Sequence, residues 1–163
     1  MFIDTHTHLF FPNFEEDLDE VIQRAKENGV EYMLIPGTDI PTTKQAIEIA
    51  EKYDFIYAAA GVHPHDTAEW KDEMINEIKE LAQHEKVVAI GEIGLDTFLK
   101  QHKRPDAFAK QQHYFNAQLE LATHYQKPVL LHIRKAHAET LAILKAQKFK
   151  LGGIAHAFSG GVE

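Results

Sequence analysis

The sequence predicts an α/β fold with a parallel sheet, built from the strand-helix units that make up a TIM (β/α)8 barrel. Short apolar runs rich in β-branched residues alternate with longer segments whose apolar side chains recur at helical spacing. The apolar runs are continuous, as expected for strands covered on both faces, and each connection is long enough to hold a helix. A TIM barrel needs eight such units in about 250 residues. The 163 residues supply six, so we expect one domain over 1–163 that is an incomplete barrel.

Each expected strand is a short apolar run that ends at a turn or at a polar side chain. Proline and glycine at 36 and 37, for example, end the second run. The six expected strands span residues 2–4, 32–35, 55–62, 87–90, 128–131 and 153–157.

Helices are expected between successive strands, where apolar residues recur every three or four positions. The first follows a capping-box pattern at Asn13 and Glu16 and stops at Asn28 and Gly29. The residues that define the five apolar faces are Leu18, Val21, Ile22 and Ala25, then Thr43, Ala46, Ile47 and Ala50, then Met74, Ile75, Ile78, Leu81 and Ala82, then Phe108, Phe115, Leu119 and Ala122, and last Leu141 and Leu144.

Composition excludes several classes of protein. There is no cysteine, which removes disulfides and thiolate metal sites. No apolar run approaches the about 20 residues that span a bilayer, and the N-terminus has no export signal, so we expect no membrane association and a cytoplasmic location. The net charge of −8 argues against a grip on long nucleic acid through many lysines and arginines. A nucleic-acid substrate would be held over a few nucleotides, with bound cations supplying positive charge.

Histidine or glutamate stands at the end of five of the six expected strands. The carboxyl ends of the strands in a parallel barrel carry the active site, and residues i and i+2 of a strand point to the same side. Imidazole and carboxylate groups bind Zn, Ni, Co, Mn or Mg, and a glutamate can bridge two ions. The sequence therefore predicts a divalent-metal site at this edge of the sheet. The residues concerned are His6, His8, His63, Glu92 (which caps the fourth expected strand), His132 and His156.

Other polar residues have more than one interpretation. Arg134 lies two residues past His132, where its guanidinium could bind a phosphate or pair with a surface carboxylate. Asp4 could orient a ligand histidine or make a local turn contact. Five histidines fall in expected helices or loops, where surface or hydrogen-bonded polar roles are expected. These are His84, His102, His113, His124 and His137.

Five short motifs resemble, in order and spacing, the successive motifs of the TatD family of deoxyribonucleases. They are DTHTHL at 4–9, GVHPH at 61–65, GEIGLD at 91–96, LHIR at 131–134 and HAFSG at 156–160. The helix before the fifth expected strand resembles the family's helix through Gln111, Phe115, Gln118, Leu119 and Ala122. The resemblance covers the whole chain and implies metal ligation, with a glutamate bridging two ions. The implied ligands are His6, His8, Glu92, His132 and His156.

The resemblance also implies hydrolysis of phosphodiester bonds in DNA, commonly from a 3′ end, with one or two divalent cations (Mg, Mn, Zn, Ni or Co). We expect a two-metal mechanism with Glu92 as the catalytic residue, in which bound water ionises at about pH 7. His63 and Arg134 would steady the substrate phosphates, and the partner would be DNA as single-stranded ends. Two alternatives stay open: a metal-dependent hydrolase of a small ester, amide or lactone, and an inactive metal-binding fragment.

One departure from the family pattern concerns the end of the sequence. The family carries a further metal-binding aspartate in a Glu-Thr-Asp type motif near its last strand, and this sequence has no such motif. We expect an incomplete barrel, roughly 90 residues short of the typical length. The first and last strands would then be unpaired edges beside open apolar surface. We expect a missing C-terminal segment or another copy of the chain to cover them, and weak metal binding and turnover by the isolated chain.

Overall fold

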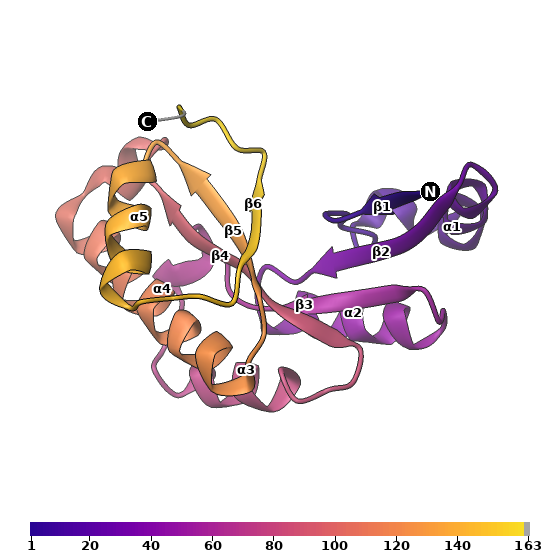
Figure 1. Ribbon diagram of the computed structural model, residues 1–163, viewed down its shortest axis with the longest axis horizontal. Coiled ribbons are helices and arrows are strands. Elements are labelled where there is room, and N and C mark those ends of the chain that lie inside the picture. Colours follow the sequence, from indigo (N-terminus) through magenta and orange to yellow (C-terminus); the bar gives the residue numbers. More distant parts are fainter. Residues whose placement is uncertain (162–163) are drawn as a thin grey trace.

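The computed structural model describes residues 1–161, and these form six parallel strands in one sheet. Strands adjacent in sequence are adjacent in space, in the order β1-β2-β3-β4-β5-β6. Figure 1 shows a bent, open sheet with β1 and β2 on one side and β5 and β6 on the other. The predicted α/β fold with six barrel-type units is confirmed. The strands are β1 Phe2–Asp4, β2 Val30–Pro36, β3 Ile56–Ala60, β4 Val87–Asp96, β5 Val129–Arg134 and β6 Gly153–His156.

Five α-helices and three short 3-10 turns connect the strands of the described residues, and α2 packs on β3, α4 on β4 and α5 on β5. Across residues 1–161, no helix combines the length and the apolar character needed to cross a bilayer. The α-helices are α1 Leu18–Glu27, α2 Ile40–Glu51, α3 Met74–Leu81, α4 Pro105–Tyr125 and α5 His137–Ala146, and the turns are η1 Pro12–Phe14, η2 Asp66–Ala68 and η3 Lys100–Lys103.

Local sequence explains where two of these helices begin. At α2 the Asp39 side chain accepts a hydrogen bond from the Thr42 backbone N–H at 2.8 Å, and the Thr42 side chain returns a contact to the Asp39 backbone, which is a capping box. At α1 the predicted capping box is wrong. Pro12 starts a separate 3-10 turn that contains Asn13, and the helix begins later, after Asp17.

The hydrophobic core joins the sheet to its helices. Ile35, Ile56 and Ile90 from the strands are fully buried, as are Ile78 of α3 and Leu119 of α4. Burying side chains of this size stabilises the fold by about 1.5–3 kcal/mol each relative to exposure. The helix layer therefore fixes the positions of the strands, and with them the strand ends.

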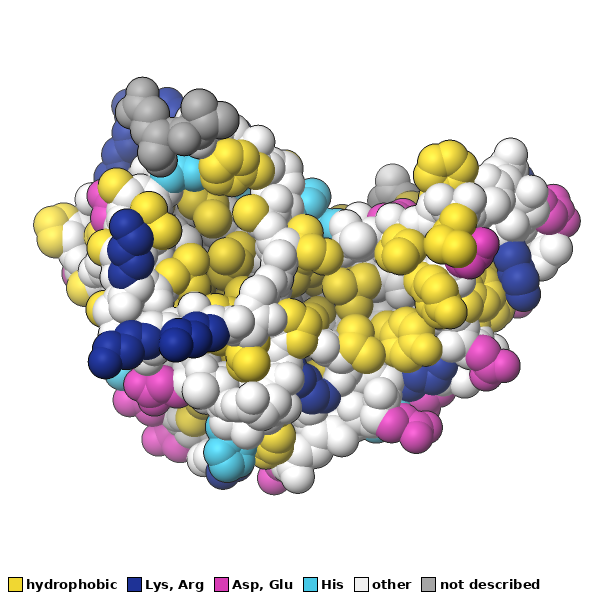
Figure 2. All heavy atoms as spheres, viewed as in Figure 1, with side chains coloured by type: hydrophobic (Ala, Val, Ile, Leu, Met, Phe, Trp, Pro, Cys, Tyr) yellow, Lys and Arg dark blue, Asp and Glu magenta, His cyan; other side chains and the backbone are white. Residues whose placement is uncertain are grey.

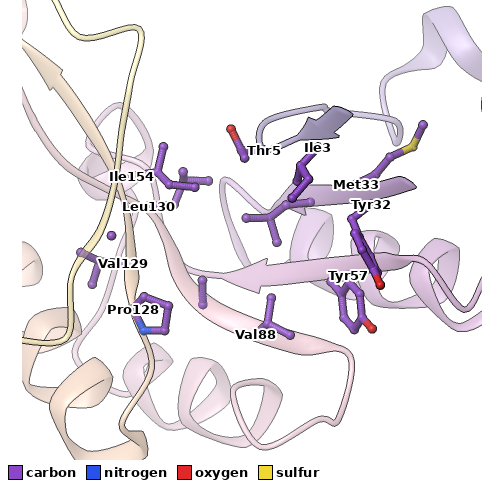
Figure 3. A pocket seen from close by; sticks show the side chains of 13 residues that line it. Ile3, Thr5, Tyr32, Met33, Tyr57, Val88, Pro128, Val129, Leu130 and Ile154 are labelled. Atoms are coloured by element: carbon purple, nitrogen blue, oxygen red, sulfur yellow. The ribbon is translucent and has the colours of Figure 1, made fainter. Parts of the chain in front are cut away.

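The inner, concave face of the sheet is apolar but open. Figure 2 shows hydrophobic side chains along this face, and Figure 3 shows a groove in which Ile3 and Tyr57 lie across from Val129 and Ile154. The groove has a volume of about 440 Å³. In a closed TIM barrel, layers of side chains fill this interior. In the described residues the groove stays accessible, and Ile3 and Ile154 are 57% and 37% exposed.

Strands β4 and β5 run further toward their carboxyl ends than the sequence predicted. β4 continues through Glu92 to Asp96, and β5 continues through His132 to Arg134. Gly94 has a φ of 143°, and a Cβ there would overlap the carbonyl oxygen of His132, so glycine permits the close approach of the two strands. The expectation that Glu92 caps its strand is therefore wrong: Glu92 lies inside β4, and Asp96 is the residue at its end.

Candidate metal centre

The buried carboxylate of Glu92 lies among the histidines predicted from the strand ends. Its Oε2 atom is 3.3 Å from His6 Nε2 and 3.8 Å from His8 Nε2. Its Oε1 atom is 3.1 Å from His132 Nδ1 and 3.8 Å from His63 Nε2. The residue is 3% exposed. The two carboxylate oxygens therefore face two different pairs of imidazoles.

His6 and His8 reach Glu92 from the segment that follows β1. His8 Nδ1 lies 3.2 Å from the carbonyl oxygen of Pro36, and because a carbonyl only accepts hydrogen bonds, we assign the His8 proton to Nδ1. The lone pair of a neutral His8 is then on Nε2, which lies 3.1 Å from His6 Nε2. The Asp4 carboxylate accepts a hydrogen bond from the His6 backbone N–H at 3.1 Å, which is the local turn contact of the two interpretations.

His132 uses both ring nitrogens. Its Nε2 atom is 2.9 Å from Asp96 Oδ2, and its Nδ1 atom faces Glu92. Burial lowers the pKa of His132, but the contacts with Glu92 and Asp96 outweigh burial and the pKa is raised. With the Nε2 proton donated to Asp96, the Nδ1 lone pair is available to a cation beside Glu92, an arrangement common around metal-bound histidines.

His63 differs from His8 and His132 because the ring nitrogen that it directs at Glu92, Nε2, carries the proton of the neutral ring. Its Nδ1 atom accepts a hydrogen bond from the His65 backbone N–H at 3.1 Å, which leaves the proton of a neutral ring on Nε2. Burial and the nearby His132 lower the pKa of His63 to about 3, so the ring is neutral near pH 7. The nitrogen that faces Glu92 is therefore a hydrogen-bond donor.

His156 joins this group, whereas Arg134 does not. The His156 ring stacks on the His6 ring, with centroids 3.4 Å apart and planes at 16°. Because β1 and β6 are the two edges of the sheet, this contact joins the carboxyl ends of the first and last strands. The Arg134 guanidinium lies 3.6 Å above the centroid of the Phe98 ring, and its residue is exposed.

The pKa shifts of Glu92, His8 and His156 favour the charge states that bind cations. Burial raises the pKa of Glu92, but contacts with His132 and His6 outweigh it and hold the pKa well below its usual range. Burial and the nearby His6 lower the pKa of His8, and the same two causes lower the pKa of His156. An ionised carboxylate and neutral imidazoles are the forms in which these groups ligate metal.

A second polar group surrounds Asp96, which is fully buried. Its Oδ2 atom is 2.8 Å from His65 Nε2, and its Oδ1 atom accepts a hydrogen bond from the Phe98 backbone N–H at 2.7 Å and lies 3.9 Å from His102 Nδ1. The expectation that His102 is a surface or hydrogen-bonded residue is wrong. Its side chain is 12% exposed, and its Nδ1 atom is buried without a hydrogen-bond partner in the described residues.

The sequence contained a partial signal for this second group. Residues 92, 94 and 96 share one face of a strand, as do residues two apart in GVHPH, so Asp96 and His65 follow the same alternation as Glu92 and His63. No such periodicity marks His102. His84 and His113 pair with Glu51 and Asp72 at 3.2 Å each, near the surface.

Two buried glutamines of α4 hold the main chain beside both groups. Gln118 is 1% exposed; its Oε1 atom accepts a hydrogen bond from Val62 N at 2.7 Å, and its Nε2 atom donates to Val62 O at 3.2 Å and to Tyr114 O at 3.3 Å. Gln111 binds the backbone of Asp96 in the same way. Its Oε1 atom accepts a hydrogen bond from Asp96 N at 2.9 Å, and its Nε2 atom donates to Asp96 O at 3.1 Å. Each glutamine therefore fixes the backbone of one residue at or next to a site histidine or carboxylate.

Comparison with known proteins places the chain in a family. The family model described as TatD related DNase matches residues 3–163. The chain belongs to this family. An uncharacterized metal-dependent hydrolase, YabD of Bacillus subtilis, is 44% identical over 100% of the chain and 63% of its own length. The 3'-5' ssDNA/RNA exonuclease TatD of Cronobacter sakazakii is 43% identical over 96% of the chain and 59% of its own length.

A solved structure of the family has the same fold. YJJV, a TatD homolog from Escherichia coli, superposes with a TM-score of 0.89 at 37% identity, covering 98% of this chain and 61% of that one. The chain thus spans about three fifths of the length of these TatD relatives. The match confirms the relation of the six-stranded sheet to the family's barrel-type fold.

The side chains of this TatD-family protein fit divalent metal ions. Three sets in the described residues have donor atoms that all lie within 4.8 Å of one another: His6, His8 and Glu92; His63, Glu92 and His132; and His65, Asp96 and His102. The His6 Nδ1 atom is also buried and has no hydrogen-bond partner among the described residues. A neutral His6 ring can therefore carry its proton on Nδ1 and its lone pair on Nε2, the atom that faces Glu92. Nitrogen and oxygen donors of this kind suit Zn, Co, Ni, Mn or Mg.

Proposed function

We propose that this chain carries the metal centre of a hydrolase that cleaves phosphodiester bonds at single-stranded DNA ends, by a two-metal mechanism. The observation that carries the proposal is the placement of Glu92, whose Oε1 and Oε2 atoms face separate imidazole pairs. A carboxylate so placed can bridge two cations. Relatives named as single-strand exonucleases support the substrate class. A cytoplasmic location stays a prediction.

The proposed ligands divide between the two oxygens of Glu92. His6 and His8 would hold one ion through Nε2 together with Glu92 Oε2, and His132 would hold the second through Nδ1 with Glu92 Oε1. His156, whose ring stacks on His6, would supply a further ligand to the pair. The bound ions would polarise the phosphoryl oxygen and lower the pKa of a bound water. The protein's own contribution is to keep the Glu92 carboxylate ionised and to direct the histidine lone pairs at it. Asp96 accepts a hydrogen bond from His132 Nε2–H, which leaves the lone pair of that ring on Nδ1.

Two residues are proposed to bind substrate instead of metal. The Nε2–H of His63 is a donor beside Glu92, so it suits a phosphate oxygen better than a cation. Arg134 stands at the end of β5 with an exposed side chain, where its guanidinium can bind a second phosphate with two hydrogen bonds. With a net charge of −8, binding over a few nucleotides is expected.

The test is an exonuclease assay on the pure 163-residue chain. Single-stranded DNA labelled at its 5′ end is incubated with Mg²⁺, Mn²⁺, Zn²⁺, Co²⁺ or Ni²⁺ in turn, and a ladder shortened from the 3′ end is expected. Glu92→Gln should remove the products, whereas Glu48→Gln, at an exposed position of α2, should not. DNA cleavage that survives Glu92→Gln would contradict the proposal.

The acidic net charge favours a second candidate, a metal-dependent hydrolase of a small ester, amide or lactone. The same preparations are therefore assayed with uncharged chromogenic esters, amides and lactones. Turnover of these without DNA cleavage would favour the second candidate. Metal binding without either activity would favour the metal-binding fragment.

We also propose that the concave groove of the sheet binds further polypeptide, equivalent to the two fifths of the relatives that this chain does not match. The groove lies between the edge strands β1 and β6, and it is lined mainly by apolar side chains, as a barrel interior is. Mixing the chain with the part of the Bacillus subtilis relative that it does not match should give a one-to-one complex in analytical ultracentrifugation. A dimer of the chain alone that the added polypeptide does not displace would contradict this occupant.

A further inference from the structure

We propose that His65, Asp96 and His102 form a third divalent-cation site, separate from the ions proposed at Glu92. The donor atoms of these three side chains lie within 4.8 Å of one another. Asp96 Oδ2 is 2.8 Å from His65 Nε2, and Asp96 Oδ1 is 3.9 Å from His102 Nδ1. Two imidazoles and one carboxylate are a donor set that suits Zn²⁺, Co²⁺ or Ni²⁺. The proposal does not rest on the function proposed for Glu92.

The buried nitrogen of His102 is the observation that points to a ligand. His102 Nδ1 is shielded from solvent and has no hydrogen-bond partner in the part of the chain that the structure describes. Its 3.9 Å distance from Asp96 is too long for a hydrogen bond. Two ligands about 2.1 Å from a tetrahedral ion lie roughly 3.4 Å apart, so a small side-chain rotation would let both bind one ion. A cation would thus satisfy a polar atom that is otherwise unpaired.

The chain holds His102 in this place by a short returning loop. Phe98 N donates a hydrogen bond to Asp96 Oδ1 at 2.7 Å, which starts the loop on the carboxylate itself. His102 N then donates to Leu99 O at 3.0 Å within η3, which turns the ring back to Asp96. Gln111 fixes the Asp96 backbone from the other side. The loop is therefore built around Asp96, and the His102 ring lies beside His65 with centroids 4.5 Å apart.

The third site would keep one coordination position open. The His65 side chain is 35% exposed, and a pocket of about 520 Å³ adjoins His65 and His102. Three protein ligands with an open fourth position leave room for water or for an oxygen ligand from substrate. The Asp96 Oδ2 atom also contacts His132, so an ion here would lie one side chain away from the Glu92 centre and add positive charge beside it.

Cobalt binding tests the site in a chain whose other candidate sets are disabled. Glu92 belongs to both other sets, so the test is made in the Glu92→Gln chain. Co²⁺ is titrated and followed by visible absorption and by equilibrium dialysis. One equivalent that depends on His102 is expected: adding His102→Phe should abolish it, whereas adding His113→Phe should leave it unchanged. His113 is the matched control because it is a 62% exposed histidine on α4.

Replacing His102 with another metal-binding residue distinguishes the loss of a ligand from a loss of Co²⁺ binding caused by misfolding. His102→Cys in the same chain should retain Co²⁺ and add a near-ultraviolet thiolate-to-cobalt band, which appears only when residue 102 ligates the ion. The proposal is overturned if the Glu92→Gln chain binds no Co²⁺, if His102→Phe leaves binding unchanged, or if the His102→Cys chain shows no such band. Failure of the Glu92 centre would look different, because the Glu92→Gln chain would then hold as much metal as the unaltered chain.

Discussion

Gln118 of α4 tests how the helix layer holds the strand ends. Its amide occupies both backbone groups of Val62, the residue before His63, inside a region where Gln118 is 1% and Val62 is 2% exposed. Gln118→Ala leaves this N–H and C=O without partners. Each buried unpaired group costs about 1–3 kcal/mol, so about 2–6 kcal/mol is the range, and we expect about 3 kcal/mol because water can enter the space. That is a large fraction of the stability of a domain of this size.

The assay is urea unfolding followed by circular dichroism, with stability taken from the midpoint at unchanged slope. Gln118→Met keeps the length of the side chain and removes only its amide, so it should lose nearly as much as alanine. Gln112→Ala, six residues earlier on α4 with a half-buried side chain, is the control and should change little. A loss below about 0.5 kcal/mol for both Gln118 variants, the size of an ordinary surface effect, would refute the reasoning.

Three further predictions concern the site itself. Glu92→Gln should weaken metal affinity by about 100-fold or more while the circular dichroism spectrum stays unchanged, because losing even a residue that only contacts a metal ligand costs about 10–100-fold. Affinity is measured by isothermal titration, and an unchanged value would place the metal centre elsewhere. His63→Ala or Arg134→Ala should weaken substrate binding about tenfold, the effect of losing one charge-assisted hydrogen bond. The amount of bound metal, measured by mass spectrometry, should stay constant, and a loss of metal would show that the altered residue is a ligand. Gly94→Ala should lower the free energy of unfolding by about 3 kcal/mol, because the new Cβ would strain the backbone and overlap β5. Gly152 also has a positive φ (71°) but open space around it, so Gly152→Ala should lower the free energy of unfolding by less. Equal losses would show that the contact with β5 is unimportant.

Much of the fold could be predicted because apolar runs and helical spacing are local properties. The expected strands at 2–4 and 87–90 begin where β1 and β4 begin. The end of β4 could not be predicted in this way, because Gly91 and Gly94 read as strand breakers. Only pairing with β5 explains them: a Cβ on either glycine would overlap Leu130 or His132. Tertiary contact, and not propensity, therefore extends the strand to Asp96.

The grouping of the candidate ligands in space could be predicted where they follow a strand and not where they follow a loop. His6, His8 and His132 lie close to Glu92 because the ends of parallel strands meet at one edge of the sheet. His102 comes to Asp96 through a loop whose turn is fixed by hydrogen bonds to a side chain and to η3. No periodicity in the sequence encodes such a path.

The stacking of His6 on His156 has a thermodynamic consequence. These rings belong to the two edge strands, which share no ladder of backbone hydrogen bonds in the described sheet. In the proposed centre, Glu92 would link an ion held by His6 and His8 to an ion held by His132 and His156. Such a centre would act as a reversible cross-link between β1 and β6, and cross-links that close long loops restrict the unfolded chain most. At a free metal concentration 100 times the Kd, binding to the folded state alone adds about 2.7 kcal/mol. Metal supply would thus set how firmly the carboxyl ends of β1 and β6 are held together, and a chelator would lower the free energy of unfolding of this protein.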